Sequence, residues 1–105
     1  MADDEPTVTD AADAHRYELR LGDAVAGYAE YHRRGESRTA FTHTVVEQEY
    51  AGRGFGSTLI RGALDAERAA GRAVLPYCPF VRGYIEKHPE YLDLVPADRR
   101  AEFSL

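Results

Sequence analysis

The sequence is poor in cysteine, lysine and tryptophan, and it lacks a long run of apolar residues. It has one cysteine, one lysine and no tryptophan among 105 residues. One cysteine excludes an internal disulfide, and no Cys/His cluster has the spacing of a zinc site. No apolar run approaches the ~20 residues of a membrane span, and the first residues lack the features of a signal peptide. These absences favour a cytoplasmic protein without a structural metal.

Basic residues are missing from the beginning of the chain. Residues 1–14 contain five acidic residues and no basic one, and the whole chain has a formal net charge of −5. The rest of the chain is therefore neutral overall, which argues against nucleic acid as the main partner. An acidic segment with Pro6 and several alanines is typical of a disordered tail. We therefore expect a disordered tail over residues 1–14, one domain over residues 15–98 and a C-terminal tail over residues 99–105.

The hydrophobic pattern predicts an α/β fold with a mixed sheet. Residues 15–21, 24–33 and 38–46 have strand patterns separated by turn signals, which predicts three antiparallel strands at the N-terminal end. Apolar residues from Phe55 onward have helical spacing, and Gly71 is expected to cap that helix at its C-terminus. A short strand over residues 72–77 and a helix starting at Pro79 follow. The third strand thus opens a strand–helix–strand–helix arrangement with parallel pairing.

Glycine occupies every second position from Gly52 to Gly56, between the third strand and the helix. Few Cβ atoms there would block a ligand from lying against the backbone. The first N–H groups of a helix have no internal partner, and the helix dipole adds positive charge. With Arg53 in the loop, the pattern predicts a phosphate or pyrophosphate site, although the glycines are also explained by a tight turn. The spacing matches neither a P-loop nor the dinucleotide pattern G-x-G-x-x-G.

Two motifs resemble a known family. The run V-E-Q-E-Y-A-G-R-G-F-G-S-T-L, which starts at Val46, resembles the acetyl-CoA loop Q/R-x-x-G-x-G/A of the GNAT N-acetyltransferases. It departs from the pattern at Ala51, where Gln or Arg is usual. The run C-P-F-V-R-G-Y-I-E-K-H-P-E-Y, from Cys78 to Tyr91, is similar to short single-domain GNAT-like proteins of the YjdJ type. The resemblance implies a GNAT fold, in which two parallel strands splay apart around the pantetheine arm. Here these strands would end near Val46 and Cys78.

The resemblance also implies a function. It predicts an acetyl-CoA-dependent N-acetyltransferase that moves an acetyl group directly to an unidentified amine. The expected partners are acetyl-CoA and this amine, a small metabolite or a protein. Neither nucleic acid nor a membrane is expected as a partner. The protein is expected to be a monomer or a weak homodimer. The thioester would lie near Val45 and Val46, whose backbone N–H groups would polarise its carbonyl. The residues expected to bind the cofactor are Val45, Val46, Gly52, Arg53, Gly54, Phe55, Gly56 and Ser57.

Cys78 and His43 are the candidate catalytic residues. Cys78 lies where a strand ends and a helix begins, which favours a thiolate. It would act as an acid toward the CoA sulfur or as an acetyl-carrying nucleophile, or else it is a small buried apolar side chain. His43 suits a general base because imidazoles titrate near neutral pH. It is expected on the strand face of Phe41 and Val45, where a structural role explains it equally well.

One expected catalytic group is missing. Many GNAT enzymes place a tyrosine acid in the helix after the second cofactor strand, and this position is Ile85 here. Tyr84 is one residue away, about 100° around the helix, and does not simply replace it. A non-catalytic CoA-binding module is therefore the alternative function. A nucleotide-binding domain of another type is disfavoured by the spacing of the glycine loop.

Overall fold

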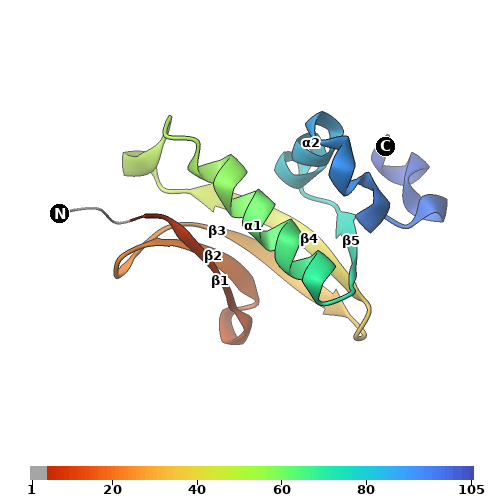
Figure 1. Ribbon diagram of the computed structural model, residues 1–105, viewed down its shortest axis with the longest axis horizontal. Coiled ribbons are helices and arrows are strands. Elements are labelled where there is room, and N and C mark those ends of the chain that lie inside the picture. The colour runs from red at the N-terminus through yellow and green to blue at the C-terminus, as the bar shows by residue number, and fades with distance from the viewer. Residues whose placement is uncertain (1–4) are drawn as a thin grey trace.

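A five-stranded mixed sheet forms the centre of the protein in the computed structural model, which describes residues 5–105 (Figure 1). The strand order follows the sequence, and the first four strands pair antiparallel. The last strand pairs parallel with the fourth, as predicted for the strand after the first helix. The mixed α/β fold class is therefore confirmed. The strands are β1 (Thr7–Ala11), β2 (Arg16–Leu21), β3 (Ala24–Arg34), β4 (Arg38–Val46) and β5 (Ala73–Pro76).

Helix α1 (Phe55–Ala69) lies along one face of this sheet, and α2 (Pro79–Lys87) follows β5 (Figure 1). The apolar stripe of α1 is buried against the strands, as its spacing predicted. Gly71 has a φ of +73° just after α1, and Pro79 occupies the first turn of α2. Both helix boundaries thus follow from residues whose backbone preferences fit them. Among the described residues, no helix combines the length and the apolar character needed to cross a bilayer.

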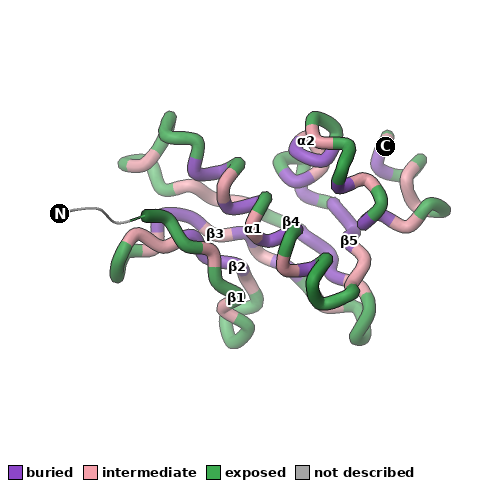
Figure 2. The backbone as a smooth tube through the Cα atoms, viewed as in Figure 1, coloured by how far each residue is buried: buried purple, intermediate pink, exposed green. Residues whose placement is uncertain are grey.

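We call the sheet face that packs against α1 the inner face, and the opposite one the outer face. Tyr17, Tyr31 and Phe41 form an aromatic cluster on the inner face, with ring centroids 5.4 to 6.3 Å apart. Figure 2 shows buried backbone along the middle of the sheet and along one side of α1. In β5, Val74 and Leu75 are both buried, so this strand is covered on both faces, as is usual for parallel strands.

The prediction of a disordered tail over residues 1–14 is wrong where the structure describes it, and residues 1–4 lie outside the described part. Thr7–Ala11 forms β1, which pairs with β2 at the edge of the sheet. Val8 packs against Gly62 of α1, where a Cβ atom on the glycine would lie only 2.7 Å from Val8. Asp10 accepts hydrogen bonds from Tyr31 and Arg33. These tertiary contacts compensate for the polar, acidic composition of the segment.

The expected C-terminal tail over residues 99–105 is also wrong. After α2 the chain forms short 3₁₀ helices, which are η3 (Pro89–Leu94), η4 (Ala97–Arg99) and η5 (Ala101–Phe103). Phe103 is 2% exposed, and its ring packs edge-on against Tyr77 at 5.1 Å. Arg99 donates a hydrogen bond to the Tyr77 hydroxyl at 2.9 Å. The segment is therefore part of the domain, because its aromatic side chain completes the packing beside β5.

A β-bulge in β4 changes which side chains face α1. Glu30 of β3 is opposite His43, but the next residue, Tyr31, is opposite Phe41, so Thr42 is an extra residue. Side chains of directly opposed residues share a face of the sheet. Phe41 therefore faces inward with Tyr31, and Thr44 faces inward with Ala29. His43 and Val45 face outward with Glu30 and Tyr28.

Candidate active site

Strands β4 and β5 separate halfway along β4. Their pairing ends where Phe41 is opposite Pro76, and the Cys78 N–H then donates to the Phe41 carbonyl at 2.9 Å. Beyond this point the contact between the two segments is made by side chains, with the Thr44 hydroxyl 3.3 Å from the Cys78 sulfur. The last part of β4 therefore has an edge that β5 does not cover. This is the splay expected between the strands that end near Val46 and Cys78.

The backbone of Val46 faces this uncovered edge. The N–H of Glu47 donates to the Ala26 carbonyl of β3 at 2.8 Å. Because successive N–H groups of a strand point to opposite edges, the Val46 N–H points away from β3. By the same alternation the Val45 N–H points toward β3. Of the two valines predicted to polarise a carbonyl, Val46 thus has the suitable orientation and Val45 does not.

The glycine loop presents a row of free donors next to this edge. Within the described chain, the backbone N–H groups of residues 52–57 donate no hydrogen bond, and no side chain caps α1. The first bond of the helix runs from the Thr58 N–H to the Gly54 carbonyl at 3.2 Å. Free N–H groups at the positive end of a helix dipole are a binding site for anions.

The three glycines of the loop have different structural roles. Gly52 and Gly54 have φ values of +81° and +76°, which other residues adopt only with strain. Gly56 is inside the helix, where a Cβ atom would lie 2.6 Å from the ring of Phe80 in α2. The glycines therefore shape the turn and allow α2 to approach α1. Within residues 5–105, no atom other than those of the adjacent residues lies within 4 Å of a Cβ atom added to Gly52 or Gly54, so this side of the loop is open.

Arg53 is the cation of the loop. Its guanidinium lies over the rings of Phe55 and Tyr50, at 4.8 and 5.9 Å from their centroids. Among residues 5–105 it makes no ion pair within 4.0 Å. The charge is thus held beside the free N–H groups by aromatic contacts, and no carboxylate of the described residues pairs with it.

The bulge separates the two candidate catalytic residues. Cys78 is 4% exposed and contacts Thr44, which faces inward. His43 is exposed and faces outward, opposite Glu30. The expectation that His43 shares a face with Phe41 is wrong, because Thr42 interrupts the alternation between them. Cys78 and His43 therefore lie on different sides of the opening between β4 and β5.

Helix α2 carries the other residues that the sequence singled out. Ile85, which stands at the position of the family's tyrosine acid, is 1% exposed and belongs to the core. Tyr84 stacks on His88 with ring centroids 4.0 Å apart, and His88 Nδ1 donates to the Tyr84 carbonyl at 2.9 Å. Tyr91 donates a hydrogen bond to Asp65 of α1 at 2.7 Å. The bond between Tyr91 and Asp65 attaches the segment after α2 to α1.

A pocket of about 220 Å³ lies between the first turn of α1 and one side of α2. It begins at Ser57, the last residue of the row of free N–H groups. Sequence reasoning did not predict this pocket, because it depends on the packing of the two helices. Its lining consists of Ser57, Pro79, Phe80, Gly83, Tyr84, Lys87 and His88.

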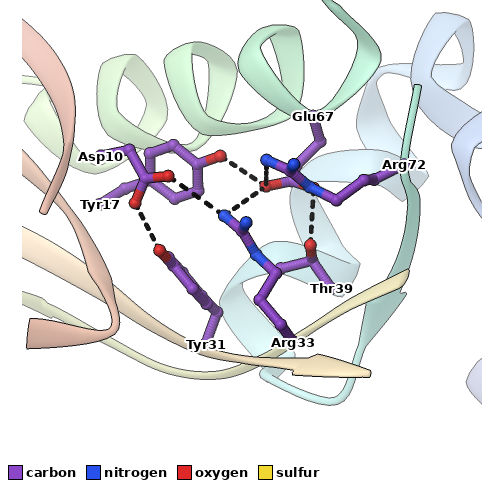
Figure 3. Close-up of polar contacts among 7 residues, drawn as sticks. All are labelled: Asp10, Tyr17, Tyr31, Arg33, Thr39, Glu67 and Arg72. Atoms are coloured by element: carbon purple, nitrogen blue, oxygen red, sulfur yellow. Dashed lines mark hydrogen bonds and ion pairs between the residues drawn. The ribbon is translucent and has the colours of Figure 1, made fainter. Parts of the chain in front are cut away.

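Sequence reasoning also missed the polar centre of the inner face (Figure 3). Glu67 of α1 is fully buried and accepts hydrogen bonds from Tyr17 at 2.5 Å and Thr39 at 2.6 Å. Arg72 and Arg33 pair with the same carboxylate at 2.8 and 3.3 Å. One signal was available, because Glu67 continues the apolar stripe of α1 three residues after Leu64. A carboxylate on such a stripe requires cationic partners.

Comparison with known proteins agrees with this geometry. The family of GCN5-related N-acetyl-transferases matches residues 16–94. A GCN5-like protein from Staphylococcus aureus, solved by NMR, superposes with a TM-score of 0.65 at 18% identity over 91% of each chain. Ard1 from Thermoplasma volcanium gives a TM-score of 0.49 at 16% identity, over 57% of this chain and 41% of its own. No curated protein matches. Because the family match spans most of the domain, the chain belongs to the GCN5-related N-acetyltransferases, a family of acyl-transferring enzymes.

Proposed function

We propose that this enzyme transfers the acetyl group of acetyl-CoA directly to an amine at the opening between β4 and β5. One observation carries the proposal: the free N–H groups of residues 52–57 adjoin the edge of β4 that β5 leaves uncovered. An anion site beside an open strand edge fits a ligand with a pyrophosphate and an extended amide-containing arm. Pantetheine is such an arm, and an uncovered strand edge offers it backbone hydrogen bonds.

The residues present fit this ligand. The open side of the loop at Gly52 and Gly54 leaves room for phosphate oxygens, and Arg53 adds a cation. The usual Gln or Arg of the family pattern is Ala51 here, so the backbone N–H groups and Arg53 provide the binding of the pyrophosphate. The Val46 N–H then lies at the edge where a thioester carbonyl needs a hydrogen-bond donor.

Bound acetyl-CoA supplies a thioester, whose carbon forms a bond to the acceptor nitrogen while its bond to sulfur breaks. The Val46 N–H stabilises the charge that develops on the carbonyl oxygen. His43, on the outer face, accepts the proton that the attacking amine must lose. The Cys78 thiol, on the inner side, is positioned to donate a proton to the departing sulfur. This division follows from the bulge, because donor and acceptor groups lie on opposite sides of the opening.

The alternative is a module that binds CoA without turnover, and one observation favours it. Ile85 is buried in the core, so the position of the usual tyrosine acid contributes no proton. In our proposal Cys78 is the acid instead, and its contact with Thr44 beside the opening supports this role. We also place the protein in the cytoplasm, because reducing conditions there keep its one buried thiol free.

Calorimetry with acetyl-CoA, CoA, ATP and NAD, each titrated separately, tests the proposed site. We expect binding of acetyl-CoA and CoA, and weak or no binding of ATP and NAD. A screen of amines with acetyl-CoA then tests the transfer, and the release of the free CoA thiol is the quantity measured. Binding of CoA without turnover of any amine would leave the non-catalytic module as the function. A protein that binds neither CoA species would contradict the proposed site.

A further inference from the structure

A row of three polar residues crosses the outer face of the sheet and ends beside the opening between β4 and β5. Arg16 of β2 is directly opposite Glu30 of β3, and Glu30 is directly opposite His43 of β4. Directly opposed residues share a face of the sheet, so all three side chains face outward. Neighbouring strands lie about 4.8 Å apart, so β2 is about 10 Å from β4 along this row. A ligand whose nitrogen lies at His43 can therefore reach β3 and β2.

The C-terminal segment occupies the outer face on the other side of the opening, next to β5. Tyr77 follows Pro76, which is paired with the inward-facing Phe41, so the Tyr77 side chain faces outward. Phe103 packs edge-on against its ring, and Arg99 donates a hydrogen bond to its hydroxyl. An amine bound on the outer face therefore has room to extend in the opposite direction, across β3 toward β2.

Arg16, Glu18 and Arg20 form a cluster on β2, which we call the β2 cluster. Glu18 is 5% exposed, and each of its oxygens pairs with one guanidinium, that of Arg16 at 2.9 Å and that of Arg20 at 2.7 Å. Arg16 also lies over the ring of Tyr28, 4.2 Å from its centroid. These contacts hold both guanidinium groups in place and use only some of their N–H donors. One carboxylate neutralises one of the two arginines, so the β2 cluster keeps one positive charge.

Glu30 is the opposite charge on the same face, and it is closer to the opening. It is half-buried, and among residues 5–105 it makes no ion pair within 4.0 Å, although Arg16 is directly opposite it. Arg16 pairs with Glu18 instead, as part of the β2 cluster. The outer face therefore offers a negative charge beside His43 and, one strand further away, a positive charge with free donors.

We propose that the acceptor is a primary amine that carries a carboxylate about 10 Å from its nitrogen. Arg16 and Arg20 bind the carboxylate, for which guanidinium groups are suited, and Glu30 attracts the ammonium group to the side of His43. The inference rests on the proposed function, because it takes the outer side of the opening as the place where the amine attacks. Polyamines are poor acceptors in this arrangement, because their second cation would lie beside the positive charge of the β2 cluster.

Transfer from acetyl-CoA to three amines of equal length tests this inference. 8-Aminooctanoic acid has the carboxylate, its amide is neutral at that end, and 1,8-diaminooctane has a second cation there. For the unmodified protein we expect kcat/KM for the acid to exceed that for the amide about three- to tenfold, the range for two partly exposed charge pairs. The value for the diamine should be the lowest of the three. The preference for the acid should become smaller at high salt.

Variants of the β2 cluster should change the ratio of kcat/KM for the acid to that for the amide in opposite directions. Arg16→Gln and Arg20→Gln each remove a positive charge, so each should lower the ratio about threefold. Glu18→Gln removes the negative charge of the cluster and should raise the ratio. Arg34→Gln, an exposed cation on the outer face at the far end of β3, is the matched control and should leave the ratio unchanged.

A purely structural role of the β2 cluster would give a different result. Loss of local structure would lower kcat/KM for the acid and the amide alike, whichever charge is removed. Equal values for acid and amide in the unmodified protein would overturn the inference, as would changes of the ratio in the same direction in Arg16→Gln and Glu18→Gln. In either case the proposed function would stand, since acetyl transfer would still occur. A protein that binds acetyl-CoA and acetylates none of the amines would refute the proposed transfer and this inference together.

Discussion

Replacing Glu67 by glutamine should cost this protein a large part of its stability. The carboxylate is fully buried, and each of its oxygens accepts more than one hydrogen bond. A glutamine of the same shape would turn an NH₂ group toward donors, whichever way it lies. It would also leave the charges of Arg33 and Arg72 without their buried counterion. Removing one member of a buried ion pair costs about 3–5 kcal/mol.

The partial exposure of both arginines reduces the loss of stability that we expect. Their side chains are 28% and 20% exposed, so water screens each charge to some degree. We therefore expect a loss of about 2–4 kcal/mol at pH 7, out of a total of about 5–15 kcal/mol for a domain of ordinary stability. For a chain of this size, the midpoint of thermal unfolding should fall by at least about 10 °C.

The pH dependence of this loss provides a sharper test. Burial alone raises the pKa of the Glu67 carboxyl, but hydrogen bonds from Arg72, Thr39 and Tyr17 outweigh it and lower the pKa below 4.5. The folded state thus binds this proton less tightly than the unfolded state. The contribution of the carboxylate is complete above the unfolded-state pKa and is lost as the pH falls through the folded-state pKa. The difference in the free energy of unfolding between the original protein and Glu67→Gln should therefore become smaller below about pH 4.

Urea unfolding followed by far-ultraviolet circular dichroism measures both quantities. Glu36→Gln, at an exposed position in the turn between β3 and β4, is the control and should stay within about 0.5 kcal/mol of the original protein. A free energy of unfolding of Glu67→Gln within about 1 kcal/mol of that of the original protein at pH 7 would refute the reasoning. A gap that stays constant from pH 7 to pH 3 would show that the charge of Glu67 is not its source.

The remaining predictions concern packing, binding and transfer. Gly62→Ala should lower the free energy of unfolding in urea by about 1–3 kcal/mol, although alanine usually stabilises a helix relative to glycine, because the new methyl group meets Val8. Adding Val8→Ala to this variant should restore most of the loss. Gly54→Val should weaken CoA binding at least tenfold by calorimetry. Gly35→Val, also at positive φ in open space, is the control and should not weaken it. Equal affinities of the two variants for CoA would show that the loop is not part of the site. Cys78→Ala should leave CoA binding intact and slow transfer, and an unchanged rate would make Cys78 a packing residue. His43→Gln should lower kcat/KM for the amine without changing acetyl-CoA affinity, and an unchanged kcat/KM would contradict the role of base.

Local patterns predicted most of the central elements. The alternation in β2, the Gly22 turn and the helical spacing after Phe55 are short-range signals, and the elements that they predict appear within a residue or two. The errors lie at both ends of the domain. β1 is held through Val8 and Asp10, and the last segment through Phe103. Each of these contacts joins residues far apart in the sequence, which no local pattern records.

The candidate site was predicted in part for the same reason. The glycine loop is a local motif, and its free N–H groups follow from helix geometry alone. The orientation of His43 depends on one extra residue in β4, and periodicity assigned that residue to a regular strand. The pocket at Phe80 and Lys87 requires the approach of two helices, so it appears only in three dimensions. Glu67 was visible as a polar residue on an apolar stripe, but its partners come from three strands and from the loop after α1.

The extra residue Thr42 also affects how relatives of this enzyme should be compared. In a regular strand, residues at equal offsets from the start have the same surroundings in every relative. Here the residues after Thr42 have exchanged sides, so a gap placed one position away pairs a residue of the inner face with one of the outer face. An alignment of this region is therefore meaningful only when it is anchored on both sides of Thr42, at Phe41 and at Glu47. Mutations transferred from a relative without these anchors would be introduced on the wrong side of the sheet.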